Sequence, residues 1–261
     1  MSLGPSGRTQ LVVIMHPAFC GCGARTLRWA HAVNSRHQLV AALGNASVDA
    51  LEADVSSLPA DEQVPVMLHP PATEVDLTAA QFLAIVQRSG TQKILKLDLK
   101  TDQIIKQVVD IILHHHLTDM TPLVLNADVV GSATEVPAVD AHTLLTQLER
   151  LQATRLPPLV SLGWCPPSEG TRSLTLSQIS EMATLARGRP ATLAVRADVA
   201  LASEEALVAL MGDLPGCGVT LWAHDGDSVC PEGARRLLER LRPAPVWLDM
   251  PPKLLSHFTA S

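Results

Sequence analysis

Two acidic residues, Glu52 and Asp54, are separated by one small residue within an apolar run. If this run is a strand, its period-two geometry places both carboxylates on one face and Ala53 on the other. Two neighbouring carboxylates inside a protein repel each other and resist burial, and a hard cation with oxygen ligands relieves both effects. The pattern therefore predicts a site for one divalent cation, Mg²⁺ or Ca²⁺.

A second polar alternation lies in KLDLK, residues 96–100. In a strand its polar members share one face, so Asp98 could add a third carboxylate and the lysines a cationic group. The alternative is a lysine-rich edge strand.

Polar residues close almost every predicted strand. In chain order they are His31, Glu52 and Asp54, His69, Lys96, Asp98 and Lys100, Asn126 and Asp128, Ser161, Arg196 and Asp198, Asp225, and Asp249. One such residue is ordinarily a helix cap or a turn former, but a complete series is typical of a site built at the carboxyl ends of strands. Asn126 and Asp128 share a face and could line this site or orient its ligands, with helix capping as the alternative for Asp128. Arg196 is a candidate anion contact.

The elements that would position these residues alternate between short apolar runs and helix-length amphipathic stretches. The predicted strands are 27–32, 48–55, 64–69, 93–99, 122–129, 159–164, 192–199, 218–223 and 244–249. The predicted helices are 77–88, 102–117, 139–151, 176–187, 202–211 and 232–241.

Most predicted strands are continuously apolar, as parallel strands covered on both faces are. If 64–69 is an excursion, about eight strand–helix units remain, which predicts an α/β fold of the (β/α)₈ TIM-barrel type. An open doubly wound sheet is the alternative, but no Gly-x-Gly-x-x-Gly turn follows the first strand. We expect residues 1–25 to form an N-terminal extension and residues 26–261 a single barrel domain.

Composition narrows the function classes. Of the 261 residues 47% are hydrophobic and 18% charged, and the net charge is −6 with no basic cluster, so nucleic acid is not expected as a partner. No apolar run reaches the ~20 residues of a transmembrane helix. The five cysteines follow no disulfide or zinc spacing. We therefore expect a soluble protein of the cytoplasm.

In combination, these motifs resemble the menorin family. They are WAHAVNS (29–35), EADV (52–55), HPP (69–71), KLDLK (96–100), LNAD (125–128), SLGW (161–164), VRA (195–197), VTLW (219–222) and VWLD (246–249). Menorin-like proteins are in turn similar to glycerophosphodiester phosphodiesterases and spider-venom phospholipase D toxins. Those enzymes are barrels that use two histidines and a carboxylate-bound divalent metal.

The resemblance implies a role for individual residues. His31 and His69 match the catalytic histidines, and Lys100 matches the lysine that contacts the phosphate. Glu52, Asp54 and Asp98 match the metal ligands. Asn34 lies where substrate-contacting groups are expected, and Trp222 occupies the place of a tryptophan near the end of the seventh strand. Both are candidate substrate-binding residues. The departures are Ala32 and Pro70, where the phosphodiesterases usually have Arg and Asp.

Phosphodiester cleavage needs one group to take a proton, another to give one, and positive charge on the phosphoryl oxygens. The predicted residues supply all three. The leading hypothesis is therefore a phosphodiesterase, or a lyase of the same mechanism, acting on a small or lipid-like phosphodiester. The alternative is a non-catalytic menorin-like barrel that binds a partner protein.

Overall fold

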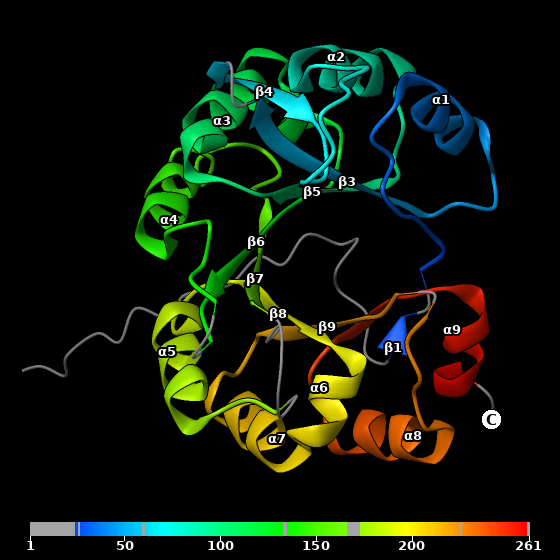
Figure 1. Cartoon of the computed structure of the whole chain (residues 1–261), viewed down its shortest axis with the longest axis vertical. Coiled ribbons are helices and arrows are strands. Elements are labelled where there is room, and N and C mark those ends of the chain that lie inside the picture. Colours follow the sequence, from blue (N-terminus) through cyan, green and yellow to red (C-terminus); the bar gives the residue numbers. More distant parts are fainter. Residues whose placement is uncertain are drawn as a thin grey trace, which may run out of the picture.

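The computed structural model describes residues 24–25, 27–58, 61–132, 135–165, 173–224 and 226–259 (Figure 1). Residues 1–23 of the expected N-terminal extension and Asp225 lie outside the described residues. Within the described ranges, no helix combines the length and the apolar composition needed to cross a membrane.

One sheet forms the centre of the molecule, in the order β1-β10-β9-β8-β7-β6-β5-β3-β2. Its strands are β1 (Ala24–Arg25), β2 (Trp29–Ala30), β3 (Ala50–Leu58), β5 (Ile94–Leu99), β6 (Leu123–Val130), β7 (Leu159–Trp164), β8 (Ala191–Arg196), β9 (Gly218–Trp222) and β10 (Val246–Asp249). All pairings along this order are parallel.

Two short strands that follow each other in the chain, β1 and β2, together take the place of the first strand of the barrel. β1 pairs with β10 at one edge, and β2 pairs with β3 at the other. Counted as one split strand, they join the two edges, and the sheet forms a nearly closed barrel of 8 parallel strands. The predicted TIM-barrel-type fold is confirmed.

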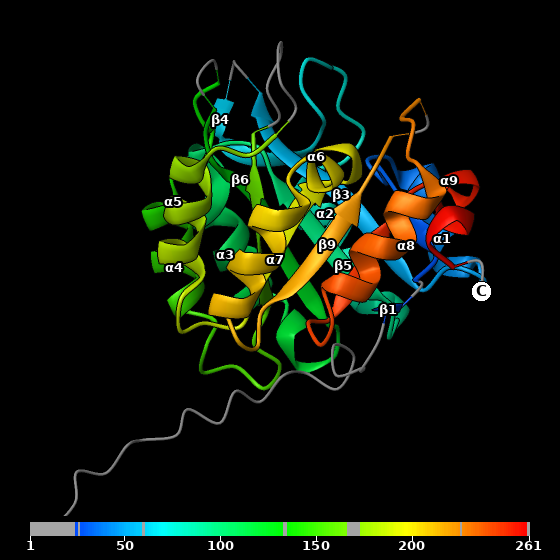
Figure 2. The same cartoon turned by 90° about the horizontal axis from the view of Figure 1, so that it is seen from below.

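Helices follow the strands and cover the outside of the barrel (Figures 1 and 2). They are α1 (Arg36–Gly44), α2 (Ala79–Ser89), α3 (Ile105–His114), α4 (Ala141–Glu149), α5 (Leu176–Ala186), α6 (Ala197–Ala202), α7 (Glu204–Asp213), α8 (Pro231–Arg240) and α9 (Pro252–Thr259). Their apolar faces pack on the outward residues of the strands, such as Leu51, Leu97 and Leu125, in one continuous core.

The expected excursion is the antiparallel strand β4 (Asp61–Met67), which pairs only with β3. β3 continues beyond the rim of the barrel, where β4 pairs with it. After β4 the chain passes through His69 to α2. His69 is thereby brought to the end of the barrel at which β3 ends.

Three helical segments depart from the expected pattern. The predicted strand 192–199 ends at Arg196, and α6 begins at Ala197, so the polar residue Asp198 lies in a helix rather than at a strand end. Neither α1 nor α9 was predicted. In α1 only Leu39 and Ala42 are buried, and its start is set by a capping box between Ser35 and Gln38 rather than by an amphipathic stripe.

The interior of the barrel divides into an apolar floor and a polar upper part. The floor is a separate cluster of buried residues toward the amino ends of the strands, formed by Ala50, Ile94, Val124, Leu159 and Trp247. Two residues further along β3 and β5, the inward positions become Glu52 and Lys96, and then Asp54 and Asp98. The site therefore opens at the carboxyl ends of the strands, as in other barrels of this type.

Candidate active site

A cavity of about 360 Å³ occupies the carboxyl end of the barrel. It is lined by His31, Ala32, Glu52, Asp54, His69, Lys96, Asp98, Lys100, Asn126, Asp128, Ala194, Trp222, His224 and Asp249. Eight of the ten predicted site residues are among these lining residues. The other two, Asn34 and Arg196, lie outside this set.

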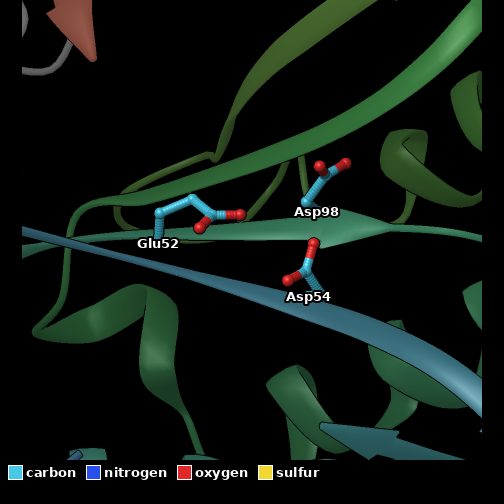
Figure 3. Close-up of side chains that lie close together, drawn as sticks. All are labelled: Glu52, Asp54 and Asp98. Carbon is cyan, nitrogen blue, oxygen red and sulfur yellow. The ribbon is translucent and has the colours of Figure 1, made fainter. Parts of the chain in front are cut away.

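Three carboxylates meet on one side of this cavity (Figure 3). Glu52 and Asp54 project from β3, and Asp98 projects from the neighbouring position to Asp54 on β5. Oxygen atoms of all three lie within 4.8 Å of one another. Glu52 and Asp54 are buried, and Asp98 is partly exposed. The period-two spacing thus gives the arrangement that the sequence predicts.

The backbone after β2 holds Glu52. Ala32 donates its backbone N–H to Glu52 Oε2 at 2.8 Å. To do so, Ala32 adopts a left-handed conformation with φ of 52°, which costs a residue with a Cβ about 1–2 kcal/mol. A strained backbone at this position is consistent with a functional constraint on the loop that carries His31.

Two asparagines orient the aspartates. Asn34 donates its side-chain N–H to Asp54 Oδ2 at 2.8 Å and accepts the backbone N–H of Asp54 at 2.8 Å. Asn126 donates to Asp98 Oδ1 at 2.7 Å. The carbonyl oxygen of Asn126 is buried and has no hydrogen-bond partner in the described part of the chain. Asn34 therefore fixes Asp54 through its side chain and its backbone, while Asn126 also presents an unused acceptor.

Lys100 bridges two of the carboxylates. Its Nζ lies 3.1 Å from Asp54 Oδ1 and 2.5 Å from Asp98 Oδ2. Burial acts to lower the pKa of Lys100, but Asp98 and Asp54 outweigh this effect and raise the pKa above its ordinary value. Lys100 is therefore a fixed cation beside the carboxylates.

A second charged network joins opposite sides of the barrel. Lys96 on β5 donates to Asp249 Oδ2 on β10 at 3.0 Å, and both side chains are buried. His31 Nδ1 lies 3.3 Å from Asp249 Oδ1 and 3.4 Å from Glu52 Oε2. Asp249 thus orients the imidazole while Lys96 holds Asp249.

The charges of this network shift the pKa values of its members. The hydrogen bond with Asp249, aided by the charge of Glu52, raises the pKa of His31 to about 9. Burial acts to raise the pKa of Asp249, but Lys96 and His31 outweigh it and lower that pKa to about 2. In the metal-free protein His31 is therefore an imidazolium at neutral pH.

Glu52 shows why the carboxylates fit a divalent cation. Burial, together with the neighbouring charge of Asp54, raises the pKa of Glu52 to about 7 against the opposing charge of Lys96. A carboxyl that resists ionisation at neutral pH becomes a good ligand once a cation balances its charge. Three clustered carboxylates are the oxygen ligands that Mg²⁺ and Ca²⁺ prefer.

The remaining predicted residues differ in their surroundings. His69 and Trp222 line the cavity, and the Trp222 ring meets the His224 ring edge-on at 5.2 Å between centroids. Arg196 instead donates two hydrogen bonds to Asp198, at 2.6 and 2.8 Å. The substrate contact expected for Arg196 stays a prediction.

Sequence reasoning assigned no role to Asp249 or His224 and no specific partner to Lys96. One feature of the sequence pointed to Asp249 as a residue of the site: it is the polar residue that ends the last predicted strand. Nothing local indicates its partners, since Lys96 and His31 are distant in sequence and meet Asp249 only through closure of the barrel. His224 lies beyond the end of β9 and carried no comparable signal.

Asp128 depends on a glycine of the next strand. Asp128 pairs in register with Gly163 on β7, and a Cβ at position 163 would collide with the Asp128 carboxyl group. Burial and the charge of Asp98 raise the pKa of Asp128 to about 7. Gly163 thus leaves the space that lets an acidic side chain point into the barrel.

The fold and site define a parallel barrel with a candidate acidic metal centre at its carboxyl end. Comparison with known families gives a match of residues 24–255 to the Menorin N-terminal domain. The chain therefore belongs to the menorin family. It is similar to protein FAM151B of Homo sapiens, with 26% identity over 236 residues, which cover 86% of this chain and 82% of that protein.

Two solved structures of enzymes also align with the chain. Oxaloacetate acetylhydrolase, bound to the inhibitor 3,3-difluorooxalacetate, has 11% identity and a TM-score of 0.46 over 86% of this chain and 75% of that chain. The 3-keto-D-glucoside 4-epimerase YcjR from E. coli has 14% identity and a TM-score of 0.45 over 90% of this chain and 96% of that chain.

The buried Lys96–Asp249 pair leads to a stability prediction. Replacing Asp249→Asn leaves a buried ammonium without its carboxylate, so we expect the free energy of unfolding to fall by about 3 kcal/mol. Urea unfolding of the metal-free protein measures this change. The double variant Lys96→Met/Asp249→Asn is expected to lose less than the sum of the two single variants.

Asp49→Asn serves as the control, because Asp49 pairs with Arg28 on the surface and its loss is expected to cost less than about 1 kcal/mol. If Asp249→Asn and Asp49→Asn lowered the free energy of unfolding equally, the result would contradict a tight buried ion pair between Lys96 and Asp249.

Proposed function

We propose that this protein is a metal-dependent phosphodiesterase, or a lyase of the same mechanism, that acts on a small or lipid-like phosphodiester. The observation that carries the proposal is the convergence of three carboxylates, two histidines and a lysine on one cavity. The cytoplasmic location and a protein partner stay predictions.

The carboxylates Glu52, Asp54 and Asp98 would hold the cation, Mg²⁺ or Ca²⁺. When bound, it supplies positive charge to the phosphoryl oxygens. Lys100 adds a second positive charge on the same side of the cavity, and Asn34 and Asn126 keep the aspartate oxygens in place. Asn126 and Trp222 would contact the substrate.

The two histidines would carry the proton transfers. One P–O ester bond breaks while one P–O bond forms to a water oxygen, or to a hydroxyl of the substrate in the lyase reaction. One imidazole takes the proton of the attacking oxygen, and the other gives a proton to the leaving oxygen. In the metal-free protein His31 carries the proton that the second role needs, since Asp249 stabilises its imidazolium.

The first prediction for this function concerns the metal. Glu52→Gln with Asp54→Asn should abolish binding of Mg²⁺ or Ca²⁺ in isothermal titration calorimetry, because two charged ligands are lost. The free energy of unfolding of the metal-free protein should stay unchanged or rise. The variant carbonyl oxygens can still accept from Ala32 and Asn34, and a close pair of like charges is removed.

The matched control is Glu149→Gln with Asp213→Asn, which removes two carboxylates from exposed helix positions. It should bind the cation as the native protein does. Loss of the fold in the Glu52/Asp54 variant would instead assign these carboxylates a structural role.

The second prediction concerns the histidines. His31→Ala and His69→Ala should each lower turnover of a generic phosphodiester, such as bis-p-nitrophenyl phosphate, by at least ~100-fold. The double variant should lose little more, because both residues serve one proton relay. Activity of the native protein should rise and then fall with pH, since each imidazole is active in only one protonation state.

Cation binding must persist in both single variants for this mechanism to hold. If the native protein turned over the substrate and both variants retained full activity, the two-histidine mechanism would be wrong. If the native protein showed neither cation binding nor turnover, the result would favour the alternative, a barrel that acts by binding a partner protein.

A further inference from the structure

The ammonium group of Lys100 lies between two of the carboxylates that are candidate cation ligands. Its Nζ is 3.1 Å from Asp54 Oδ1 and 2.5 Å from Asp98 Oδ2. Oxygen atoms of Glu52, Asp54 and Asp98 all lie within 4.8 Å of one another, so one small cation can contact all three carboxylates (Figure 3). The lysine is therefore bonded to two members of the ligand set that the cation would use.

The second oxygen of each aspartate is held by an asparagine. Asp54 Oδ2 accepts a hydrogen bond from the side chain of Asn34 at 2.8 Å, and Asp98 Oδ1 accepts one from Asn126 at 2.7 Å. These hydrogen bonds leave Asp54 Oδ1 and Asp98 Oδ2 for a ligand that the two aspartates share. Both of these oxygens are bonded to Lys100. A divalent cation and the lysine therefore need the same two oxygen atoms.

Binding both positive groups to these oxygens at once is unfavourable. Mg²⁺ and Ca²⁺ lie about 2.0–2.6 Å from their oxygen ligands, so an ammonium kept on the same oxygens would lie against the metal ion. Positive charges at such a separation repel each other strongly in a partly buried site. Lys100 has room to move, because it lines the cavity of about 360 Å³ and carries its charge on a flexible chain.

We propose that Lys100 competes with the divalent cation: its ammonium group holds Asp54 Oδ1 and Asp98 Oδ2 in the metal-free protein and releases them when Mg²⁺ or Ca²⁺ binds. This inference rests on the proposed function, because it takes these carboxylates as the cation ligands. The released ammonium group stays in the cavity, where it is free to contact the phosphoryl group of the substrate. Cation binding thus precedes productive binding of the phosphodiester.

Such competition lowers the apparent affinity for the cation. The cation binds only to the fraction of molecules in which Lys100 has left the aspartates, and the apparent Kd rises in inverse proportion to that fraction. Removal of the lysine ammonium group should therefore tighten cation binding, although the lysine itself is a member of the candidate active site.

The test measures cation affinity without phosphate, by isothermal titration calorimetry of the full chain with Mg²⁺ and with Ca²⁺. We expect Lys100→Met to bind the cation at least ~10-fold more tightly than the native protein. Lys100→Gln keeps a hydrogen-bond donor without the charge, and it should also bind the cation more tightly. This second variant tests the proposal if Lys100→Met does not fold.

Lys106→Met is the matched control, because it removes an exposed ammonium group on α3 that pairs with Asp110. It should leave the cation affinity within about 2-fold of the native value, since exposed charges are screened by solvent and salt.

A crystal structure of the native protein with Mn²⁺ and without phosphate gives a second measurement. Lys100 Nζ should lie more than about 3.5 Å from both Asp54 Oδ1 and Asp98 Oδ2, which is beyond hydrogen-bonding distance. A metal ion bound by the two aspartates with the ammonium group still bonded to either oxygen would overturn the competition.

The calorimetry separates failure of this inference from failure of the proposed function. Unchanged or weaker cation binding by both Lys100 variants would overturn the competition and leave the cation site intact. If neither the native protein nor either variant bound the cation, the result would reject the metal site, and with it the proposed function and this inference.

Discussion

Holding three carboxylates close together inside a protein is the constraint on which the rest of this site depends. Their oxygens lie within 4.8 Å of one another, and two of the three side chains are buried. Like charges at this separation repel strongly in a medium less polar than water. Neighbouring groups offset part of that cost. Lys100 supplies a positive charge beside the aspartates, and Asn34 and Asn126 donate hydrogen bonds to them. The backbone N–H of Ala32 donates a hydrogen bond to Glu52.

The same constraint explains the division of the barrel interior. An apolar cluster fills the barrel toward the amino ends of the strands, and the cavity that contains the carboxylates lies toward the carboxyl ends. Lys96 lies just above this floor, and its charge is balanced by Asp249. The same pairing holds the Asp249 carboxylate beside His31. The carboxylate that balances the buried charge of Lys96 therefore also orients a candidate catalytic imidazole.

Much of this arrangement could be predicted from the sequence because it is local. The one-residue spacing between Glu52 and Asp54 determines that they share a face, and the alternation of apolar strands with amphipathic helices determines a parallel sheet covered on both sides. The partners of Asp249 could not be predicted, because they depend on closure of the barrel between β1 and β10. The helix at residues 197–202 was missed because VRADVALA continues the apolar character of β8 without a turn signal.

A crystal structure of the protein with Mn²⁺ and inorganic phosphate would locate the metal and the phosphate directly, because anomalous scattering identifies the metal by its own signal. We expect one metal ion bound by Glu52, Asp54 and Asp98 at about 2.0–2.6 Å. We also expect a phosphate between that ion and the two imidazoles of His31 and His69, in contact with Lys100. A metal ion bound elsewhere, or a phosphate that reaches neither histidine, would contradict this arrangement.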